Sequence, residues 1–397
     1  MTLPLIECGE TELAIVYGAA TVKGARRTLF IEEEQGAIAH LVERGEEVVS
    51  PIEALRCLWR EATCTPLLLC SPLKEGASSR SMFSSLKLMH DRVQATLAEW
   101  SDFGLLPFTN ARRTMSRPTY DAAPFFGSCS GVPAVVCGSG PSMGKLTSGS
   151  GLLIAAGSAL PRLVSKGIEP SVAVALDPHP LLPAFQEHGP YDLPLFFQAR
   201  LTPEYTKLIT GKRYLVGGDD FPSRRLGLRQ IPPGWNAGSF AVALAIDLGC
   251  SPIVLVGFDD RERGDSRLAR AYIAELASAH PDRDYIYASE GEPIDGMRCG
   301  VVEEWPQASL PDRSLTPLSL SYDEFDRSLG RLLDLLDALI ECGGTHPLYE
   351  VDLESEIAYK EAIAPAWRVW RNIGEWKSPL AKALLFRRIA RSYYDAV

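Results

Sequence analysis

The chain lacks the patterns that mark metal sites and disulfide frameworks. Its 397 residues include nine cysteines and six histidines, yet no Cys-x-x-Cys occurs and the histidines show no zinc-binding spacing. An odd number of scattered cysteines favours reduced thiols and predicts a cytoplasmic protein. The formal net charge of −10 argues against nucleic acid as a partner.

Signals for export or membrane insertion are not expected either. The N-terminus carries Glu7, Glu10 and Glu12 without a basic region, so it does not read as a signal peptide. The longest apolar run, Ala237–Phe258, contains Asp247 and a Gly-Cys-Ser-Pro break. This run predicts a helix, a turn and a strand, and no membrane span.

The hydrophobic pattern predicts an α/β protein with a helical end. Residues 1–110 predict a small N-terminal α/β unit, and residues 111–130 an irregular linker rich in proline, arginine and aromatic residues. Residues 131–300 alternate apolar strands with helices, which is typical of a doubly wound, mostly parallel sheet of Rossmann type with ligands at the strands' carboxyl ends. Residues 320–397 show helical spacing, and we expect any oligomer contact to use these helices. The expected core strands are Ala134–Cys137, Leu152–Ala156, Val172–Leu176, Leu195–Gln198, Arg213–Val216, Ile253–Val256 and Tyr285–Tyr287, with helices near Ser158–Lys166, Ser239–Leu248 and Arg267–His280.

The most informative stretch is a Gly-Ser-Gly-Pro-Ser loop that follows an apolar strand. Gly138 and Gly140 allow a backbone to approach a phosphate closely, Pro141 fixes a turn, and Ser142 is expected to cap a following helix. Backbone N–H groups at such a helix start hold anions. We therefore expect Gly138, Ser139, Gly140, Pro141 and Ser142 to bind the phosphate of a nucleotide, with an ordinary strand-to-helix turn as the alternative.

This loop fits neither of two common nucleotide signatures. A Walker loop requires glycine where Ser139 stands and serine or threonine where Leu146 stands. An NAD fingerprint requires Gly-x-Gly-x-x-Gly, but the third glycine is one residue out of register. It also requires an acidic residue at the end of the next strand, which here ends in Ala-Ala-Gly followed by Ser158. Ser158 is kept as a candidate nucleotide contact.

Other candidate residues follow later strands or open a later helix. Asp177 ends a strand and is expected to orient a donor or acceptor, and His179, two residues further on, is a candidate general base. A turn aspartate with a surface histidine is the alternative for this pair. Gly238 and Ser239 open a helix, which predicts a second anion site or a simple helix cap. Asp259 follows another strand and is a candidate base.

Paired carboxylates raise the possibility of Mg²⁺, although the metal ligands stay undetermined. Asp259-Asp260 and Asp219-Asp220 each follow a strand, where carboxylates hold Mg²⁺ together with ligand phosphates, and solvated turns are the alternative. Three arginines precede the glycine loop and either reach an anionic ligand or lie on the surface: Arg112, Arg113 and Arg117.

Several motifs together resemble the Maf/MptE-like family, which includes motility accessory factors that modify flagellin and archaeal 6-hydroxymethylpterin diphosphokinases. The resemblance begins at the glycine loop and covers about residues 131–300. A residue that departs from the family pattern is Ser171, which replaces an expected aspartate. Leu29-Phe30-Ile31-Glu32 also resembles the N-terminal unit of motility accessory factors. The further matches are Gly167-Ile168-Glu169-Pro170, Ala175-Leu176-Asp177-Pro178, Gly238-Ser239-Phe240-Ala241, Val256-Gly257-Phe258-Asp259 and the run from Glu290 to Gly296.

The resemblance implies a core related to bacterial sialyltransferases that binds a nucleotide or a nucleotide sugar. It implies a transferase, and the N-terminal unit favours a glycosyltransferase that takes a sialic-acid-like nonulosonic sugar from a CMP donor to a protein acceptor. The alternative within the family is a 6-hydroxymethylpterin pyrophosphokinase that uses ATP and Mg²⁺. A non-catalytic nucleotide-binding or scaffold protein is a third possibility.

Overall fold

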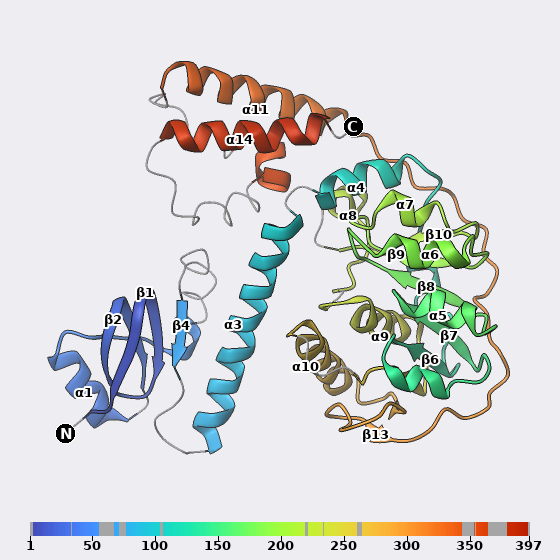
Figure 1. The fold of residues 1–397 in the computed structure, drawn as a ribbon, viewed down its shortest axis with the longest axis horizontal. Coiled ribbons are helices and arrows are strands. Elements are labelled where there is room, and N and C mark those ends of the chain that lie inside the picture. Colours follow the sequence, from blue (N-terminus) through green and yellow to red (C-terminus); the bar gives the residue numbers. More distant parts are fainter. Residues whose placement is uncertain are drawn as a thin grey trace. The chain divides into compact units, whose positions relative to one another are not determined.

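The structure is a computed structural model that describes residues 3–32, 34–54, 67–70, 77–103, 106–218, 221–232, 234–259, 264–343, 353, 355–363 and 379–395. It divides into two compact units (Figure 1). Unit 1 comprises Met1–Gly104, Ala338–His346 and Ala364–Phe386. Unit 2 comprises Leu105–Asp337, Pro347–Ile363 and Arg387–Val397. The helical C-terminal region therefore contributes to both units.

Unit 1 contains a four-stranded sheet with the order β3-β2-β1-β4. Alternate side chains of β1 and β2 face α1 on one side and α3 on the other, because successive residues of a strand point to opposite faces. The apolar residues alone predict short strands at Ala14–Tyr17 and Thr28–Ile31, and both strands begin earlier in the chain than that. The elements are β1 Leu5–Tyr17, β2 Thr21–Ile31, α1 Gln35–Glu43, β3 Glu47–Val48, β4 Leu67–Cys70 and α3 Ala77–Phe103.

Unit 2 is built on a nine-stranded sheet with the order β13-β12-β11-β6-β7-β8-β9-β10-β5, and its strand pairs are parallel. The sequence predicted this doubly wound sheet, and its core strands end within one residue of expectation. The strands are β5 Tyr120–Asp121, β6 Ala134–Cys137, β7 Leu152–Ala156, β8 Val172–Ala175, β9 Leu195–Phe197, β10 Arg213–Leu215, β11 Ile253–Val256, β12 Tyr285–Tyr287 and β13 Arg298–Cys299.

Helices cover both faces of this sheet (Figure 1). On β6, Ala134 and Val136 pack toward α9 and α10, whereas Val135 and Cys137 pack toward α5 and α6. This alternation explains why the core strands read as continuous apolar runs. The helices are α4 Leu106–Met115, α5 Ala159–Ser165, α6 Leu182–His188, α7 Pro203–Thr206, α8 Phe221–Leu226, α9 Ala237–Leu248 and α10 Gly264–Ala279, with short 3-10 turns at Ala123–Phe125 and Pro141–Lys145.

The expectation of an irregular segment over residues 111–130 is wrong in two places. The end of helix α4 and the edge strand β5 lie within it, and tertiary hydrogen bonds explain why a polar sequence folds there. The buried Asn110 side chain donates to the carbonyls of Pro178 and Arg200, each at 3.0 Å. Thr114 donates to the carbonyl of Leu201 at 3.1 Å. Helix α4 thereby fixes the loops that follow β8 and β9.

The C-terminal helices are α11 Asp323–Glu341 and α14 Pro379–Asp395, with a π-helical turn at Tyr359–Ile363. Phe325 of α11 packs edge-on against Tyr393 of α14. Arg112 of α4 forms an ion pair with Asp326, so this arginine is occupied within the fold and is not an anion ligand. Among the helices that the structure describes, none combines the length and apolarity needed to cross a membrane.

Candidate functional site

The predicted site residues lie at the carboxyl edge of the nine-stranded sheet. The chain proceeds outward from β6 through β7, β8, β9 and β10, then returns to place β11 on the other side of β6. This reversal is the topological switch point at which open α/β sheets bind ligands. The loops after β6, β7 and β11 and the start of α9 meet at this edge.

The glycine loop after β6 is packed directly against the loop after β11. The N–H group of Gly138 donates to the carbonyl of Val256 at 2.7 Å, and that of Gly140 donates to Gly257 at 2.9 Å. A Cβ atom at Gly138 would lie 2.5 Å from the Gly257 carbonyl oxygen, and one at Gly140 would lie 2.7 Å from it. These positions need glycine because two backbones touch, and their N–H groups are already paired within the protein.

Ser142 is a contact between loops and not a helix cap, which corrects the sequence-based expectation. A short 3-10 turn, Pro141–Lys145, replaces the expected helix, and Gly140 occupies its N-cap position. The Ser142 hydroxyl is buried and accepts the N–H group of Gly257 at 3.0 Å. Ser139 accepts a hydrogen bond from the Arg162 guanidinium through its carbonyl, while Pro141 is exposed.

Asp259 occupies the position where the sequence predicted a ligand phosphate. One carboxylate oxygen accepts the N–H group of Ser142 and the other accepts that of Glu290, both at 2.6 Å. The carboxylate thereby ties the loop after β6 to the loop after β12. With one hydrogen bond at each oxygen, Asp259 links the two loops, and its role as a base stays a prediction.

The start of α9 is a complete capping box. Asn236 accepts the N–H group of Ser239 at 3.0 Å, and the buried Ser239 hydroxyl accepts the N–H group of Asn236 at 3.1 Å. The Ser239 side chain is therefore occupied by the cap, which was the structural alternative. Within residues 234–259, no hydrogen-bond acceptor is paired with the N–H groups of Ala237 and Gly238, the first two of the helix.

The turn after β7 lies beside this helix start. Gly157 has φ +51°, and a Cβ atom built on it would lie 3.0 Å from the Cβ of Ala237. The next residue, Ser158, is exposed and stands at the N-cap of α5 without a side-chain capping bond. The ring of Phe258 lies on the other side, 3.0 Å from a Cβ at Gly238. Ser158, Ala237 and Gly238 thus present a hydroxyl and two N–H groups that have no acceptor among the described residues.

Asp177 and His179 lie farther along the same edge. Both are exposed, and the Asp177 carboxylate accepts the N–H group of His179 at 2.8 Å, which forms an Asx turn. Because β6 and β7 separate β8 from β11, the strands that lead to Asp177 and Asp259 are three strand spacings apart, roughly 14 Å. The structure therefore does not bring these carboxylates together. The residue that positions the Asp177 turn is Asn110, which the sequence analysis missed because nothing local distinguishes it.

Metal ligands are not gathered at this edge. The part of the chain that the structure describes contains no group of three or more His, Cys, Asp or Glu side chains suited to a metal ion. Asp219, Asp220 and Asp260, three of the carboxylates considered for Mg²⁺, lie outside the described residues.

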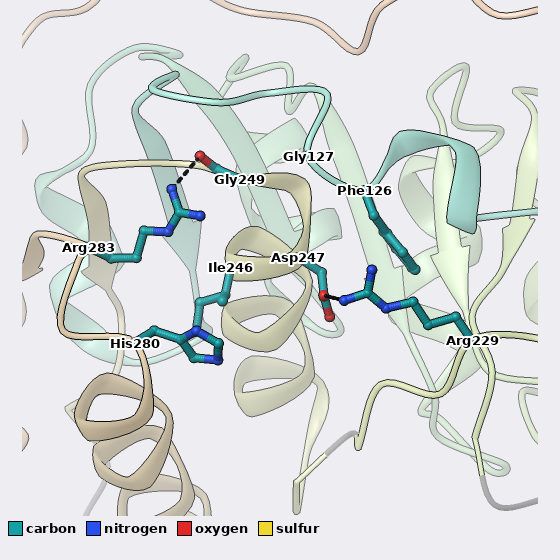
Figure 2. A pocket seen from close by; sticks show the side chains of 8 residues that line it. All are labelled: Phe126, Gly127, Arg229, Ile246, Asp247, Gly249, His280 and Arg283. Carbon is teal, nitrogen blue, oxygen red and sulfur yellow. Dashed lines mark hydrogen bonds and ion pairs between the residues drawn. The ribbon is translucent and has the colours of Figure 1, made fainter.

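A hollow of about 350 Å³ lies at the opposite end of α9 (Figure 2). Two of its charged side chains pair with each other: Arg229 contacts Asp247 at 2.6 Å and lies 4.8 Å from the centre of the Phe126 ring. Arg283 donates to the carbonyl of Gly249 at 3.1 Å, which caps the C-terminal end of the helix. Burial raises the pKa of Asp247, and Arg229 opposes that shift. These contacts describe a helix end held by ion pairs.

The doubly wound parallel sheet, with glycine turns and a capped helix at its carboxyl edge, defines unit 2 as a Rossmann-like α/β fold. Residues 108–264 match the family described as 6-hydroxymethylpterin diphosphokinase MptE-like, so this part of the chain is similar to that family. This match confirms the resemblance that the sequence motifs indicated, and it begins within α4, upstream of the predicted core boundary at residue 131.

A solved structure with a similar fold is the MAf glycosyltransferase from Magnetospirillum magneticum AMB-1. The TM-score is 0.55 at 14% sequence identity, over 98% of this chain and 74% of that chain. At this identity the likeness establishes the fold. No match was found among curated proteins.

Proposed function

We propose that this protein is a nucleotide-dependent glycosyltransferase that takes a nonulosonic sugar from a CMP donor and passes it to a protein acceptor. The match of residues 108–264 to the MptE-like family supports a transferase. The fold likeness to a MAf glycosyltransferase extends over nearly the whole chain, unit 1 included, and this favours the glycosyltransferase branch.

The observation that carries the proposal is the pair of unpaired N–H groups at Ala237 and Gly238. They begin the 12-residue helix α9, whose N-terminus attracts negative charge, and they lie at the switch point beside Gly157. The exposed Ser158 hydroxyl adds a donor for a phosphate or sugar oxygen. The glycine loop does not contact the ligand in this proposal; it stabilises the site through its contacts with the loop after β11.

A pyrophosphokinase that uses ATP and Mg²⁺ is the second candidate, and the description of the matched family favours it. Mg²⁺ binds one or two carboxylates at about 2.1 Å together with phosphate oxygens. Asp177 and Asp259 are too far apart to share one ion, so this reaction would need a different ligand set. His179 and Asp177, both exposed on the turn after β8, stay candidates for contact with the acceptor.

The decisive experiment is a titration of the full chain with CMP, CDP, ATP and GTP, with and without Mg²⁺. Binding is measured by calorimetry and by the shift in melting temperature. We expect CMP or CDP to bind without metal. Metal-dependent ATP binding would favour the kinase, and no binding of any nucleotide would favour a scaffold.

A charge placed at Ser158 tests the location of the site. Ser158→Glu adds a carboxylate beside the start of α9, so it should weaken nucleotide binding by repulsion. The acidic residue also stands at the N-terminus of α5, where it does not harm stability. The matched control is Ser148→Glu, an exposed turn residue before β7 at the opposite edge of the sheet, which should bind as the original protein does. Equal binding by both variants would contradict this location.

A further inference from the structure

Two buried cysteines lie where two segments of unit 2 run side by side. The segment before β6 donates N–H groups to the end of α9: Gly127 to Asp247 at 2.7 Å and Cys129 to Leu248 at 2.8 Å. A Cβ atom at Gly249 would lie 3.3 Å from the Cα atoms of Gly127 and Ser130, so the backbones are in contact. Cys129 and Cys250 therefore sit on adjacent stretches of chain, within the same hydrophobic core.

The two thiols also interact. A hydrogen bond from Cys250 is the largest influence on Cys129 and lowers the pKa of Cys129 to about 7, although burial opposes this shift. Ser128 and the guanidinium of Arg313 lower the pKa further. The pKa of Cys250 is raised correspondingly, by its hydrogen bond to Cys129 and by burial. The interaction between the two thiols therefore favours the loss of one proton from the pair.

Cys137 has a different environment. Cys137 is buried to the same degree, but burial raises its pKa to about 12. Cys299 and Cys342 are exposed. A thiolate is the nucleophile in thiol oxidation, so Cys129 differs chemically from Cys137 although both are buried.

A route for a small oxidant lies nearby. The hollow at the end of α9 is lined by Gly127 and Gly249, which neighbour Cys129 and Cys250 in the chain (Figure 2). Hydrogen peroxide is little larger than water, so we take this hollow as its point of approach to the pair.

We propose that Cys129 and Cys250 form a redox-active pair that hydrogen peroxide converts into an intramolecular disulfide in the folded protein. The Cys129 thiolate attacks one peroxide oxygen, the O–O bond breaks, and hydroxide leaves to give a sulfenic acid. The sulfur of Cys250 then attacks the Cys129 sulfur, and the sulfenic oxygen leaves as water with the proton from Cys250. Two thiols are oxidised by two electrons, and one peroxide is reduced to two waters.

The test is differential labelling of the full chain. Exposed thiols are first blocked with one alkylating reagent, the folded protein is treated with hydrogen peroxide, and the remaining thiols are labelled with a heavier reagent after unfolding. We expect a digest to contain a cross-linked species joining the Cys129 and Cys250 peptides, lighter by two hydrogens and lost on treatment with dithiothreitol. No lysine or arginine separates Cys129 from Cys137, so fragment ions must assign the bonded sulfur.

Cys137 serves as the matched internal control and should carry the second label. Cys250→Ser should abolish the cross-link and leave Cys129 as a sulfenic acid that dimedone traps, whereas Cys137→Ser should leave the cross-link intact; circular dichroism checks that both fold. Complete second labelling of Cys129 and Cys250 after peroxide would overturn the proposal. So would a cross-link from Cys129 to another cysteine, or oxidation of Cys137 at the same rate as Cys129. These readouts do not depend on nucleotide binding.

Discussion

The Asp259→Asn variant tests whether the Asp259 carboxylate holds the loop after β6 within the protein or contacts a bound ligand. The carboxylate accepts two backbone N–H groups, those of Ser142 and Glu290, at 2.6 Å each. An asparagine side chain has one acceptor oxygen, so one of the two N–H groups must lose its partner. Because Ser142 is buried and Glu290 is exposed, we expect the asparagine oxygen to stay with Ser142.

The cost follows from these contacts. A hydrogen bond to a charged acceptor is worth about 1.5–3 kcal/mol, but water can replace the acceptor at the exposed Glu290 amide. The bond that remains to Ser142 becomes a weaker, uncharged one. We therefore expect a loss of about 1–2 kcal/mol in local stability. This converts to a roughly 5- to 30-fold faster opening at the Glu290 amide.

Hydrogen exchange measured by mass spectrometry reads this effect at the peptide that contains Glu290. Asp177→Asn is the matched control, because its carboxylate accepts a single N–H group in an exposed turn. It should leave exchange at Glu290 unchanged. If Asp259→Asn leaves that exchange unchanged and abolishes nucleotide binding or turnover, Asp259 is a ligand-facing group and its assignment as an anchor is wrong.

Three further changes test the contacts around the candidate site and unit 2. Gly140→Ala should destabilise the protein by about 1–3 kcal/mol in urea denaturation, because its Cβ would lie 2.7 Å from the Gly257 carbonyl oxygen; an unchanged midpoint would refute the close packing. Ser239→Ala should cost about 1–3 kcal/mol, since its buried hydroxyl accepts the N–H groups of both Trp235 and Asn236, and more than the roughly 1 kcal/mol of Asn236→Ala; the reverse order in melting experiments would contradict the capping geometry. Burial opposes ionisation of Glu356, but hydrogen bonds from Arg331 and Ser328 outweigh burial and lower the pKa of Glu356. The Glu356 carboxylate therefore contributes stability at neutral pH, and this contribution is lost as the pH falls through the lowered pKa. Melting temperatures of Glu356→Gln and of the original protein should differ at pH 7 and converge in acid below about pH 4.

The sheet of unit 2 was predictable because its signal is local. Strands such as Leu152–Ala156 are apolar on both faces, and a glycine or a capping residue follows many of them. Helix α9 was predictable for the same reason, with its cap at Asn236 and a left-handed Gly249 at its end. Helix α4 was not predictable, because it is stabilised by buried hydrogen bonds from Asn110 and Thr114 to carbonyls that are distant in the chain. The neighbouring residues in the sequence do not indicate these bonds.

The sequence predicted at which edge of the sheet the candidate site lies, but not which groups are available to a ligand there. Strand ends identify which loops share an edge, but the sequence does not show which N–H groups find acceptors inside the protein. Asp259 lies far from Ser142 in the chain, so its carboxylate could not be recognised as an internal acceptor for that loop. The same limit applies to Asp177 and Asp259, whose separation depends on the order of strands in the sheet.

The glycine loop shows why one pattern serves two physical purposes. Glycine removes the Cβ atom, and the space gained admits either a phosphate or another backbone. In this protein the space at Gly138 and Gly140 is filled by the carbonyl of Gly257, so valine at position 140 would clash with backbone whether or not a nucleotide binds. Loss of nucleotide binding in such a variant would therefore reflect a disturbed fold and would not show that Gly140 contacts the nucleotide. Ser158 is exposed and makes no capping bond, so charge placed there acts on a ligand without disturbing the contact between the loops.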